Sequence, residues 1–576
     1  MGVGSSRQSR SGDPKLMRGI EEKLRSLDSV RAFSAEEMVG CQRTVQETHR
    51  AIQKKEVTLE EQLLLLHQRR QQLNNCYNSI TEVLMDQPLQ LARKIDLAVA
   101  ENMNRAMSEY PLAGCILSIS DSIPYAGTSS TCGLSRCHSI VFTTTAGLIA
   151  FLESKGALVT CKGNVSQGLM ACESDNHLFG SVSHPLDKKR SAGGSAGGDA
   201  VNVASLVVNC AIGSDIMGGI RCPALFCGLF AFKPTAGRFP QCEAAVTERW
   251  EDFDWNGSPQ SLIVPTCGPI CRSANDIALL MRAMSEYNLQ SLEVAPLAWD
   301  AVEAPKRVGV LTEFSRIMGV CSATDRALLD ALQCGGFESV AIDLNDIIID
   351  LVVHRCDVEF FVSLNLTLSS LACYLKSERF VRFLKGKIAM KEPLIEAYDY
   401  FRKYLAYPIP LLRFMLKLSF VISPREKIYV EAYLLSIDKC EDSLLNSLKL
   451  HREDVLSRFR ASNIDVCLAH GLFPAFPKGT AKDVDLSMMY CFVWNYLNFP
   501  VGTVPITTVR ADEQKYESQF TDRITEALIS NMDGSSGLPV GIQVVGLPWH
   551  DEVVVETMIA LEASLGRCAQ SYFVLN

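Results

Sequence analysis

The residues best suited to chemistry lie in two glycine-rich segments separated by an apolar one. The first segment is Ser191-Ala-Gly-Gly-Ser195-Ala-Gly-Gly-Asp199, and the second is Gly213-Ser-Asp-Ile-Met-Gly-Gly-Ile-Arg-Cys-Pro223. Glycine tolerates positive φ and adds no side chain, so backbone amides in such loops can approach a ligand closely. Because the two loops bracket a segment long enough for a helix, residues 200–212, they favour a binding or catalytic site over two structural turns.

Several kinds of element must surround these loops. Residues 1–14 are rich in Ser, Gly and Arg, and we expect a disordered tail because they cannot bury enough apolar surface to offset ordering entropy. Residues 15–107 show a helical pattern, in which Thr58 and Glu61 have the spacing of a capping box. After residue 107, short apolar runs such as 116–119 alternate with helical patterns. The sequence therefore predicts an α/β fold, with one large domain of residues 108–576 after an N-terminal helical region.

The composition indicates an ordinary folded chain. Hydrophobic residues make up 47% of the sequence and charged residues 21%, and the net charge of −9 argues against a general attraction to nucleic acid. The 21 cysteines lack paired short spacings, and Cys267 and Cys271 have no second Cys/His pair at zinc-finger spacing. We therefore expect reduced thiols, an intracellular location, no metal and no other cofactor.

The two loops and the segments around them resemble the amidase signature family, whose hallmark is a Gly/Ser-rich loop, a helix and a Thr-Asp-Ile-Gly-Gly-Ser-Ile-Arg-like segment. The matching residues are Gly193–Asp199, Ser214–Arg221, Pro223, Phe226–Gly228 and Phe232–Gly237. Three further segments look like the fatty-acid amide hydrolase branch of that family: Asn176–Gly180, Phe499–Val509 and Leu547–Glu552. The resemblance runs from about Lys55 to Leu565. It implies the amidase signature fold, a large twisted mixed β-sheet covered by helices.

The chemistry implied by the resemblance needs a lysine, a bridging serine and a nucleophilic serine. Carried over to this chain, the bridging serine is Ser195, the position of the lysine holds Ser120, and the position of the nucleophile holds Gly219. Residues 95–154 contain no lysine, so a small shift of the alignment does not restore one. Glycine has no side-chain oxygen, and a serine hydroxyl is not a useful base at neutral pH. We therefore expect a pseudoenzyme that binds a lipid amide, a fatty acyl ligand or a partner without hydrolysing it.

The resemblance also implies an oxyanion-binding loop, made of Ile216, Met217, Gly218 and Gly219. Met217 stands where the family has a glycine. If that position needs positive φ, we expect strain at Met217 and a rearranged loop. Asp215 and Arg221 are expected to frame this loop through an ion pair or hydrogen bonds rather than to bind substrate.

Two alternatives stay open. The first is an active amide or ester hydrolase with a rearranged nucleophile, either Cys222 beside the cation of Arg221 or Ser195 with a base supplied by His177 or His184. The second is a scaffold or regulatory subunit of an active paralogue. The resemblance implies a dimer, which allows either a homodimer or such a heterodimer.

Membrane contact is predicted by two segments, although no apolar run reaches the roughly 18 to 20 residues of a spanning helix. Gly2, with Ser6, fits the pattern of a myristoyl acceptor. The segment 404–422 falls where the family relative has a membrane cap, and its residues suited to the headgroup boundary are Leu411, Leu412, Arg413, Phe414, Met415, Lys417 and Leu418. The alternative for this segment is a buried helix with two snorkelling cations. We expect a cytoplasmic protein or one attached peripherally to an intracellular membrane face.

Overall fold

The computed structural model describes most of the chain. The described residues are 12–25, 33–169, 171–240, 264–289, 294, 296–311, 320–342, 344, 441–484, 488–518 and 523–566. Gly2 and the predicted membrane cap at 404–422 lie outside the described residues.

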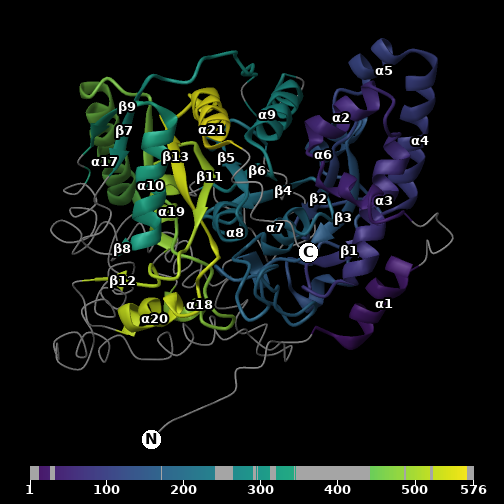
Figure 1. The fold of residues 1–576 in the computed structure, drawn as a ribbon, viewed down its shortest axis with the longest axis horizontal. Helices are drawn as coiled ribbons and strands as arrows, with labels where there is room; N and C mark the ends of the chain where they lie inside the picture. Colours follow the sequence, from purple (N-terminus) through teal and green to yellow (C-terminus); the bar gives the residue numbers. More distant parts are fainter. Residues whose placement is uncertain are drawn as a thin grey trace, which may run out of the picture.

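A mixed sheet of 11 strands runs through the middle of the molecule (Figure 1). Its strands are β1 (Ile80–Val83), β2 (Ile116–Ser120), β3 (Leu158–Gly163), β4 (Cys210–Asp215), β5 (Phe230–Lys233), β6 (Thr266–Cys271), β7 (Arg307–Leu311), β9 (Glu338–Ala341), β10 (Val466–His470), β11 (Val501–Thr508) and β13 (Pro539–Gly546). They are ordered β1-β3-β2-β4-β6-β5-β11-β13-β10-β7-β9. Two short strands, β8 (Val320–Cys321) and β12 (Tyr516–Glu517), form a separate pair. The predicted α/β fold with one large mixed sheet is confirmed.

Helices cover this sheet. Their bounds are α1 (Pro14–Arg25), α2 (Val45–Gln53), α3 (Leu59–Leu73), α4 (Asp86–Glu101), α5 (Met103–Glu109), α6 (Gly147–Ser154), α7 (Gly197–Ala204), α8 (Arg221–Cys227), α9 (Ala274–Asn288), α10 (Ser322–Gly335), α17 (Glu441–Ala461), α18 (Ala481–Val484), α19 (Met489–Tyr496), α20 (Arg523–Met532) and α21 (Asp551–Leu565). The helices α7 and α8 pack on each other and on strands, whereas α9, α10 and α21 form a second packed group on β5, β6, β11 and β13. Figure 1 shows α2 to α6 beside the end of the sheet that carries β1 and β3.

The N-terminal region contains the predicted helices and also one strand. In α3 the predicted capping box is present, because the Glu61 amide donates to Thr58 Oγ1 (3.1 Å) and the Thr58 amide donates to the Glu61 carboxylate (2.9 Å). The strand β1 pairs antiparallel with β3 and so joins residues 15–107 to the main sheet. The helical pattern did not indicate this strand, because it is only four residues long and its pairing partner lies about 80 residues away.

The direction of the strands places Ser120 and the second glycine-rich loop at the same edge of the sheet. The strand β2, third from one edge of the sheet, is parallel to both of its neighbours, β3 and β4. The carboxyl ends of parallel neighbours lie at the same edge of a sheet. Ser120 is the last residue of β2 and Asp215 is the last residue of β4, so the second loop begins at the edge where Ser120 lies.

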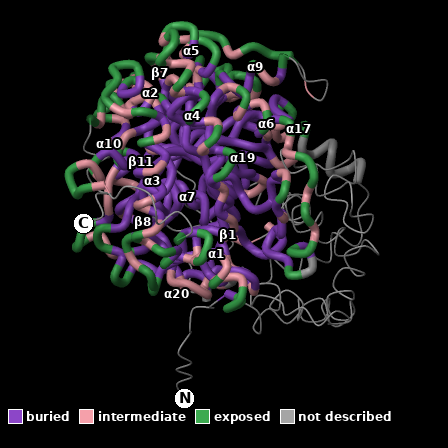
Figure 2. The backbone as a smooth tube through the Cα atoms, turned by 90° about the vertical axis from the view of Figure 1, so that its right-hand side faces the viewer, coloured by how far each residue is buried: buried purple, intermediate pink, exposed green. Residues whose placement is uncertain are grey.

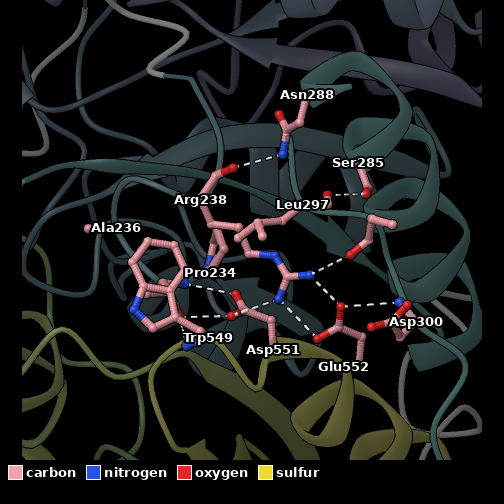
Figure 3. Close-up of polar contacts among 12 residues, drawn as sticks. Pro234, Ala236, Arg238, Ser285, Asn288, Leu297, Asp300, Trp549, Asp551 and Glu552 are labelled. Carbon is pink, nitrogen blue, oxygen red and sulfur yellow. Dashed lines mark hydrogen bonds and ion pairs between the residues drawn. The ribbon is translucent and has the colours of Figure 1, made fainter. Parts of the chain in front are cut away.

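A buried ion-pair cluster ties the start of α21 to the loop after β5 (Figure 3). Arg238 Nη1 lies 2.9 Å from Glu552 Oε2 and 3.1 Å from Asp551 Oδ2, and Nη2 donates to the Ala298 carbonyl (3.1 Å). The guanidinium also lies 5.1 Å from the centre of the Trp299 ring, within cation–π range. This cluster holds together segments that are more than 300 residues apart in the sequence.

Burial follows the layered arrangement. Figure 2 shows buried residues through the centre of the molecule and exposed residues along its outer loops and helices. Among the described helices, none combines the length and the apolar character that crossing a membrane requires.

Candidate functional site

The structure brings together Ser120, Ser195 and Gly219. Ser195 lies in the loop before α7, and Gly219 lies in the loop between β4 and α8. A Cβ atom on Gly219 would lie 2.9 Å from Ser195 Oγ, so this position faces the retained serine. Ser120 lies on the same side, because a Cβ atom on Gly213 would be 3.0 Å from Ser120 Oγ and 3.1 Å from Ala196 Cβ. The three positions singled out by the resemblance therefore lie close together.

The backbone around Gly219 has no room for a side chain. The same Cβ atom would lie 2.5 Å from the Ser214 carbonyl oxygen, closer than any ordinary van der Waals contact. A residue with a side chain would fit only if that carbonyl moved. Ser195 Oγ makes no hydrogen bond within the described residues, and the residue is 7% exposed. The loop is therefore packed around a glycine, with the retained serine hydroxyl beside it.

Ser120 donates a hydrogen bond to a buried carboxyl, that of Asp199. Ser120 Oγ donates to Asp199 Oδ2 and Ser118 Oγ donates to Asp199 Oδ1, both at 2.6 Å. Asp199 lies in the first turn of α7, is fully buried and makes no ion pair with any described cation. Burial raises the pKa of Asp199 to about 7, although the two serine hydrogen bonds act in the opposite direction. Next to the position of the family's lysine, this chain thus has a buried carboxyl with a raised pKa.

The raised pKa of Asp199 predicts a pH dependence of stability that an Asp199→Asn variant lacks. The folded chain keeps a proton on Asp199 between about pH 4 and 7, whereas the unfolded chain releases it near its ordinary pKa of about 3.9. The contribution of Asp199 to the free energy of unfolding is therefore complete below about pH 4. It falls by roughly 4 kcal/mol as the pH rises to about 7.

Denaturant unfolding at half-unit pH steps measures this effect as the difference between wild type and Asp199→Asn. A residual slope is expected in both proteins, because burial also raises the pKa of Asp276 to about 7. The exposed Glu526→Gln is the matched control, and it is expected to keep the wild-type profile. Parallel profiles for wild type and Asp199→Asn would show that Asp199 is not the titrating group.

The loop 216–219 turns at Gly218 rather than at Met217. Gly218 has φ +97°, and a Cβ atom there would lie 2.7 Å from Cys491 Cβ. Met217 is not in the left-handed region, so the condition under which strain was expected at Met217 is not met, and the residue with positive φ is the glycine that follows it. The Gly218 amide donates to Asp215 Oδ1 (2.8 Å). Within the described residues, the amides of Ile216, Met217 and Gly219 donate no hydrogen bond.

Asp215 and Arg221 form a fully buried ion pair that holds this loop. Arg221 Nε lies 2.9 Å from Asp215 Oδ2, and Nη2 lies 3.0 Å from Oδ1. Arg221 Nη1 also donates to Gln543 Oε1 (2.9 Å), and Asn495 Nδ2 donates to Asp215 Oδ1 (2.9 Å). Burial alone would raise the pKa of Asp215, but the Arg221 charge, followed by the hydrogen bonds of Arg221 and Asn495, lowers it to about 2.

Two of the groups proposed for a rearranged mechanism, Cys222 and His184, lie in unsuitable environments. Cys222 is fully buried, and burial raises its pKa well above the ordinary value, so it stays a neutral thiol. In His184, Nε2 lies 2.8 Å from the Phe226 carbonyl oxygen and Nδ1 accepts from the Leu186 amide (3.2 Å). Both ring nitrogens of His184 are therefore engaged away from Ser195. His177 is half-buried in the turn that precedes Leu178.

The described residues contain no group of three or more His, Cys, Asp or Glu side chains arranged to hold a metal ion. Cys267 and Cys271, the pair closest to a metal-binding spacing, are buried residues of β6.

Comparison with known proteins identifies the family. The family model named Amidase matches residues 61–351, just over half of the chain. The chain belongs to the amidase family. Among amidase relatives, Fatty-acid amide hydrolase 1 of Sus scrofa is 26% identical over 510 residues, covering 85% of this chain and 80% of the relative. A protein named Amidase from Gibberella moniliformis is 26% identical over 508 residues, covering 84% of this chain and 80% of the relative.

Solved structures show the same amidase fold. A structure named Fatty acid amide hydrolase superposes with a TM-score of 0.70 at 19% identity, covering 97% of this chain and 92% of that one. A crystal structure of an amidase superposes with a TM-score of 0.60 at 22% identity, covering 91% of this chain and all of that one.

Sequence reasoning missed the carboxyl of Asp199, which lies beside Ser120 in this candidate site. Asp199 was noted only as the last residue of a glycine-rich loop. Its position at the start of an otherwise apolar helix was an available signal, because a buried carboxyl there needs hydrogen-bond donors. The donors, Ser118 and Ser120, lie about 80 residues earlier in the sequence, so the pairing could not be read from spacing.

Proposed function

We propose that this protein is a catalytically inactive member of the amidase family that binds a fatty acyl ligand, either a lipid amide or a fatty acid. The observation that carries the proposal is the environment of Gly219, which faces Ser195 Oγ but holds no side-chain oxygen and leaves no space for one. Acyl transfer to the protein by the family's route needs a nucleophilic atom at that position. Hydrolysis by that route therefore has no first step.

The residues around Ser195 support the same conclusion about proton transfer. The base that would act through Ser195 is replaced by Ser120, whose hydroxyl proton is directed to Asp199 rather than to Ser195. Cys222, the nearest alternative nucleophile in the sequence, is a buried neutral thiol. A loss of one member of a catalytic unit typically lowers turnover on the order of a million-fold, and a second loss adds little.

Two features support binding without turnover. The amides of Ile216, Met217 and Gly219 have no acceptor within the described residues, so an amide or carboxyl oxygen of a ligand would have donors there. The similarity to Fatty-acid amide hydrolase 1 of Sus scrofa, at 26% identity, supports a long acyl chain as the ligand's apolar part. The buried Asp215–Arg221 pair would hold the donor loop in place.

Membrane attachment and assembly are part of the same proposal. We propose that an acyl chain on Gly2 and the segment 404–422 hold the protein at an intracellular membrane face. Flotation with liposomes, with and without Gly2→Ala, tests this attachment. Dimerisation, with itself or with an active paralogue, is tested by co-purification from cells that express both chains.

The first prediction of the proposal is that purified protein releases no fatty acid from a labelled long-chain amide above the uncatalysed rate. Ser195→Ala and Cys222→Ala are expected to give the same background, because neither residue acts as a nucleophile. A fluorescent fatty acyl probe is nevertheless expected to bind saturably and to be displaced by unlabelled fatty amide.

Each alternative function has its own signature in this experiment. Turnover that is abolished by Ser195→Ala or Cys222→Ala would show an active hydrolase with a relocated nucleophile and would overturn the proposal. Background turnover without saturable probe binding would remove the ligand-binding part and leave the scaffold alternative.

A further inference from the structure

Arg70 is a buried cation for which the described chain supplies no carboxylate. It lies in the last turn of α3 and is 1% exposed. Its terminal nitrogens donate to the Thr160 carbonyl (3.2 Å) and to Thr160 Oγ1 (2.8 Å), and one approaches Met85 Sδ at 3.7 Å. These contacts use three of the five guanidinium N–H donors, and Nε has no partner. No ion pair between Arg70 and a described acidic group exists.

The surroundings of Arg70 cannot neutralise its charge. Arginine stays protonated in proteins, and an uncompensated buried charge costs several kcal/mol. Among the described acidic groups, the Cys161 thiol is the one whose charge would act on Arg70, but burial raises the pKa of that thiol despite the Arg70 charge. The thiolate is therefore not the counter-charge.

A second unsatisfied side chain lies one turn earlier on the same helix. His67 is 2% exposed, and neither Nδ1 nor Nε2 makes a hydrogen bond of normal geometry within the described residues. Burial, and then the charge of Arg70, lower the pKa of His67 to about 3, so the ring is neutral and keeps one N–H donor. Residues three apart on a helix are neighbours on its surface. The two side chains are therefore neighbours on α3, where Arg70 reaches Thr160 of β3 and the His67 ring lies by the backbone of Leu24 in α1.

We propose that Arg70, with His67 beside it, binds a small monovalent inorganic anion such as chloride. One anion would balance the single charge of Arg70 and accept its free Nε–H. A monovalent ion matches the charge that needs compensation, whereas a divalent anion would leave a buried negative charge. Buried polar groups without a protein partner are commonly satisfied by a bound ion or water, and a full buried charge favours the ion.

The site is separate from the amidase centre but is joined to it by hydrogen bonds. Thr160 and Cys161 are consecutive on β3, and Asn202 Nδ2 on α7 approaches both Cys161 Sγ (3.8 Å) and Ser118 Oγ (3.2 Å). Ser118 is one of the two donors to Asp199. The anion would therefore stabilise the packing of α3 on the strand next to the one that carries Ser118.

The test is the thermal unfolding of the full chain at constant ionic strength, with chloride replaced stepwise by gluconate. Because an ion that binds only the folded chain stabilises it by mass action, Tm is expected to rise in proportion to the logarithm of chloride concentration above the Kd. Bromide is expected to act like chloride. Arg70→Met is expected to remove this dependence, and Arg93→Met, which changes an exposed arginine of α4, is expected to keep it.

The control outcomes distinguish a specific site from a general salt effect. A Tm that does not depend on chloride, or a dependence that persists unchanged in Arg70→Met, would overturn the proposal. If Arg70→Met does not fold, broadening of the chloride nuclear magnetic resonance line by wild type, and its reversal by bromide, decides the question. Absence of such broadening would count against the site.

Discussion

A double variant, Ser120→Lys with Gly219→Ser, is expected to hydrolyse long-chain fatty amides about 100-fold faster than the uncatalysed reaction, whereas each single variant stays at background. The reason is that lysine, bridging serine and nucleophile act as a unit, so that one restored member has nothing to act with. The Cβ atom of a serine at position 219 would lie 2.9 Å from Ser195 Oγ, and Ser195 is the retained member of that unit.

The expected 100-fold rate increase is far below the roughly million-fold increase that a complete catalytic unit provides. Two structural features explain the difference. The Ser214 carbonyl oxygen lies 2.5 Å from the position of the new Cβ atom, so the loop must shift before the serine is correctly placed. Asp199 lies beside position 120, and its ionised form would hold a lysine there in the protonated state, which is not a base.

The measurement is the initial rate of fatty acid release, with Ser195→Ala added to the double variant as the control. The triple variant is expected to return to background, because proton relay passes through Ser195. Activity in the Gly219→Ser single variant alone would show that another base already serves this site, and the assigned role of Ser120 would be wrong.

The second large effect is expected at the buried ion pair. Arg221→Met is expected to lower the free energy of unfolding by about 3 to 5 kcal/mol, because it leaves Asp215 fully buried and without its cation. The double variant Asp215→Asn with Arg221→Met is expected to be more stable than Arg221→Met alone, because it leaves no unpaired charge at this pair. Denaturant unfolding of the wild type, Asp215→Asn, Arg221→Met and the double variant measures the coupling.

The control for this effect is Arg326→Met, which breaks a part-buried ion pair with Glu513. Its cost is expected to be smaller, because some solvent reaches this pair and screens it, whereas the Asp215–Arg221 pair is fully buried. Equal losses in Arg221→Met and Arg326→Met would contradict the special role of the buried pair.

The same pair adds a dependence on acid. The pKa of Asp215 is lowered to about 2 in the folded chain, against about 3.9 in the unfolded chain. Its stabilising contribution is therefore complete above about pH 4 and is lost as the pH falls toward 2. In Asp215→Asn this loss of stability at low pH is expected to disappear. In Asp199→Asn it is instead the loss of stability with rising pH that is expected to disappear.

Much of the local structure could be read from the sequence because it depends on neighbouring residues. The capping box of Thr58 and Glu61 is an interaction over three residues, and the structure contains it. The glycine-rich loops were recognised from composition, and the resemblance carried by their motifs indicated the amidase family and its mixed sheet. Turn geometry could not be read from the sequence: whether position 217 needs positive φ stayed open, and in the structure the residue with positive φ is Gly218.

The sequence by itself determined that residues 120 and 219 cannot supply a base and a nucleophile, since that follows from side-chain type alone. Only the tertiary structure decided what surrounds them. The parallel pairing of β2 with β4 brings Ser120 to the edge of the loops, and the packing of α7 places Asp199 within 2.6 Å of its hydroxyl. These contacts join residues about 80 positions apart, and their distances depend on strand register and helix packing, which no local pattern of residues encodes.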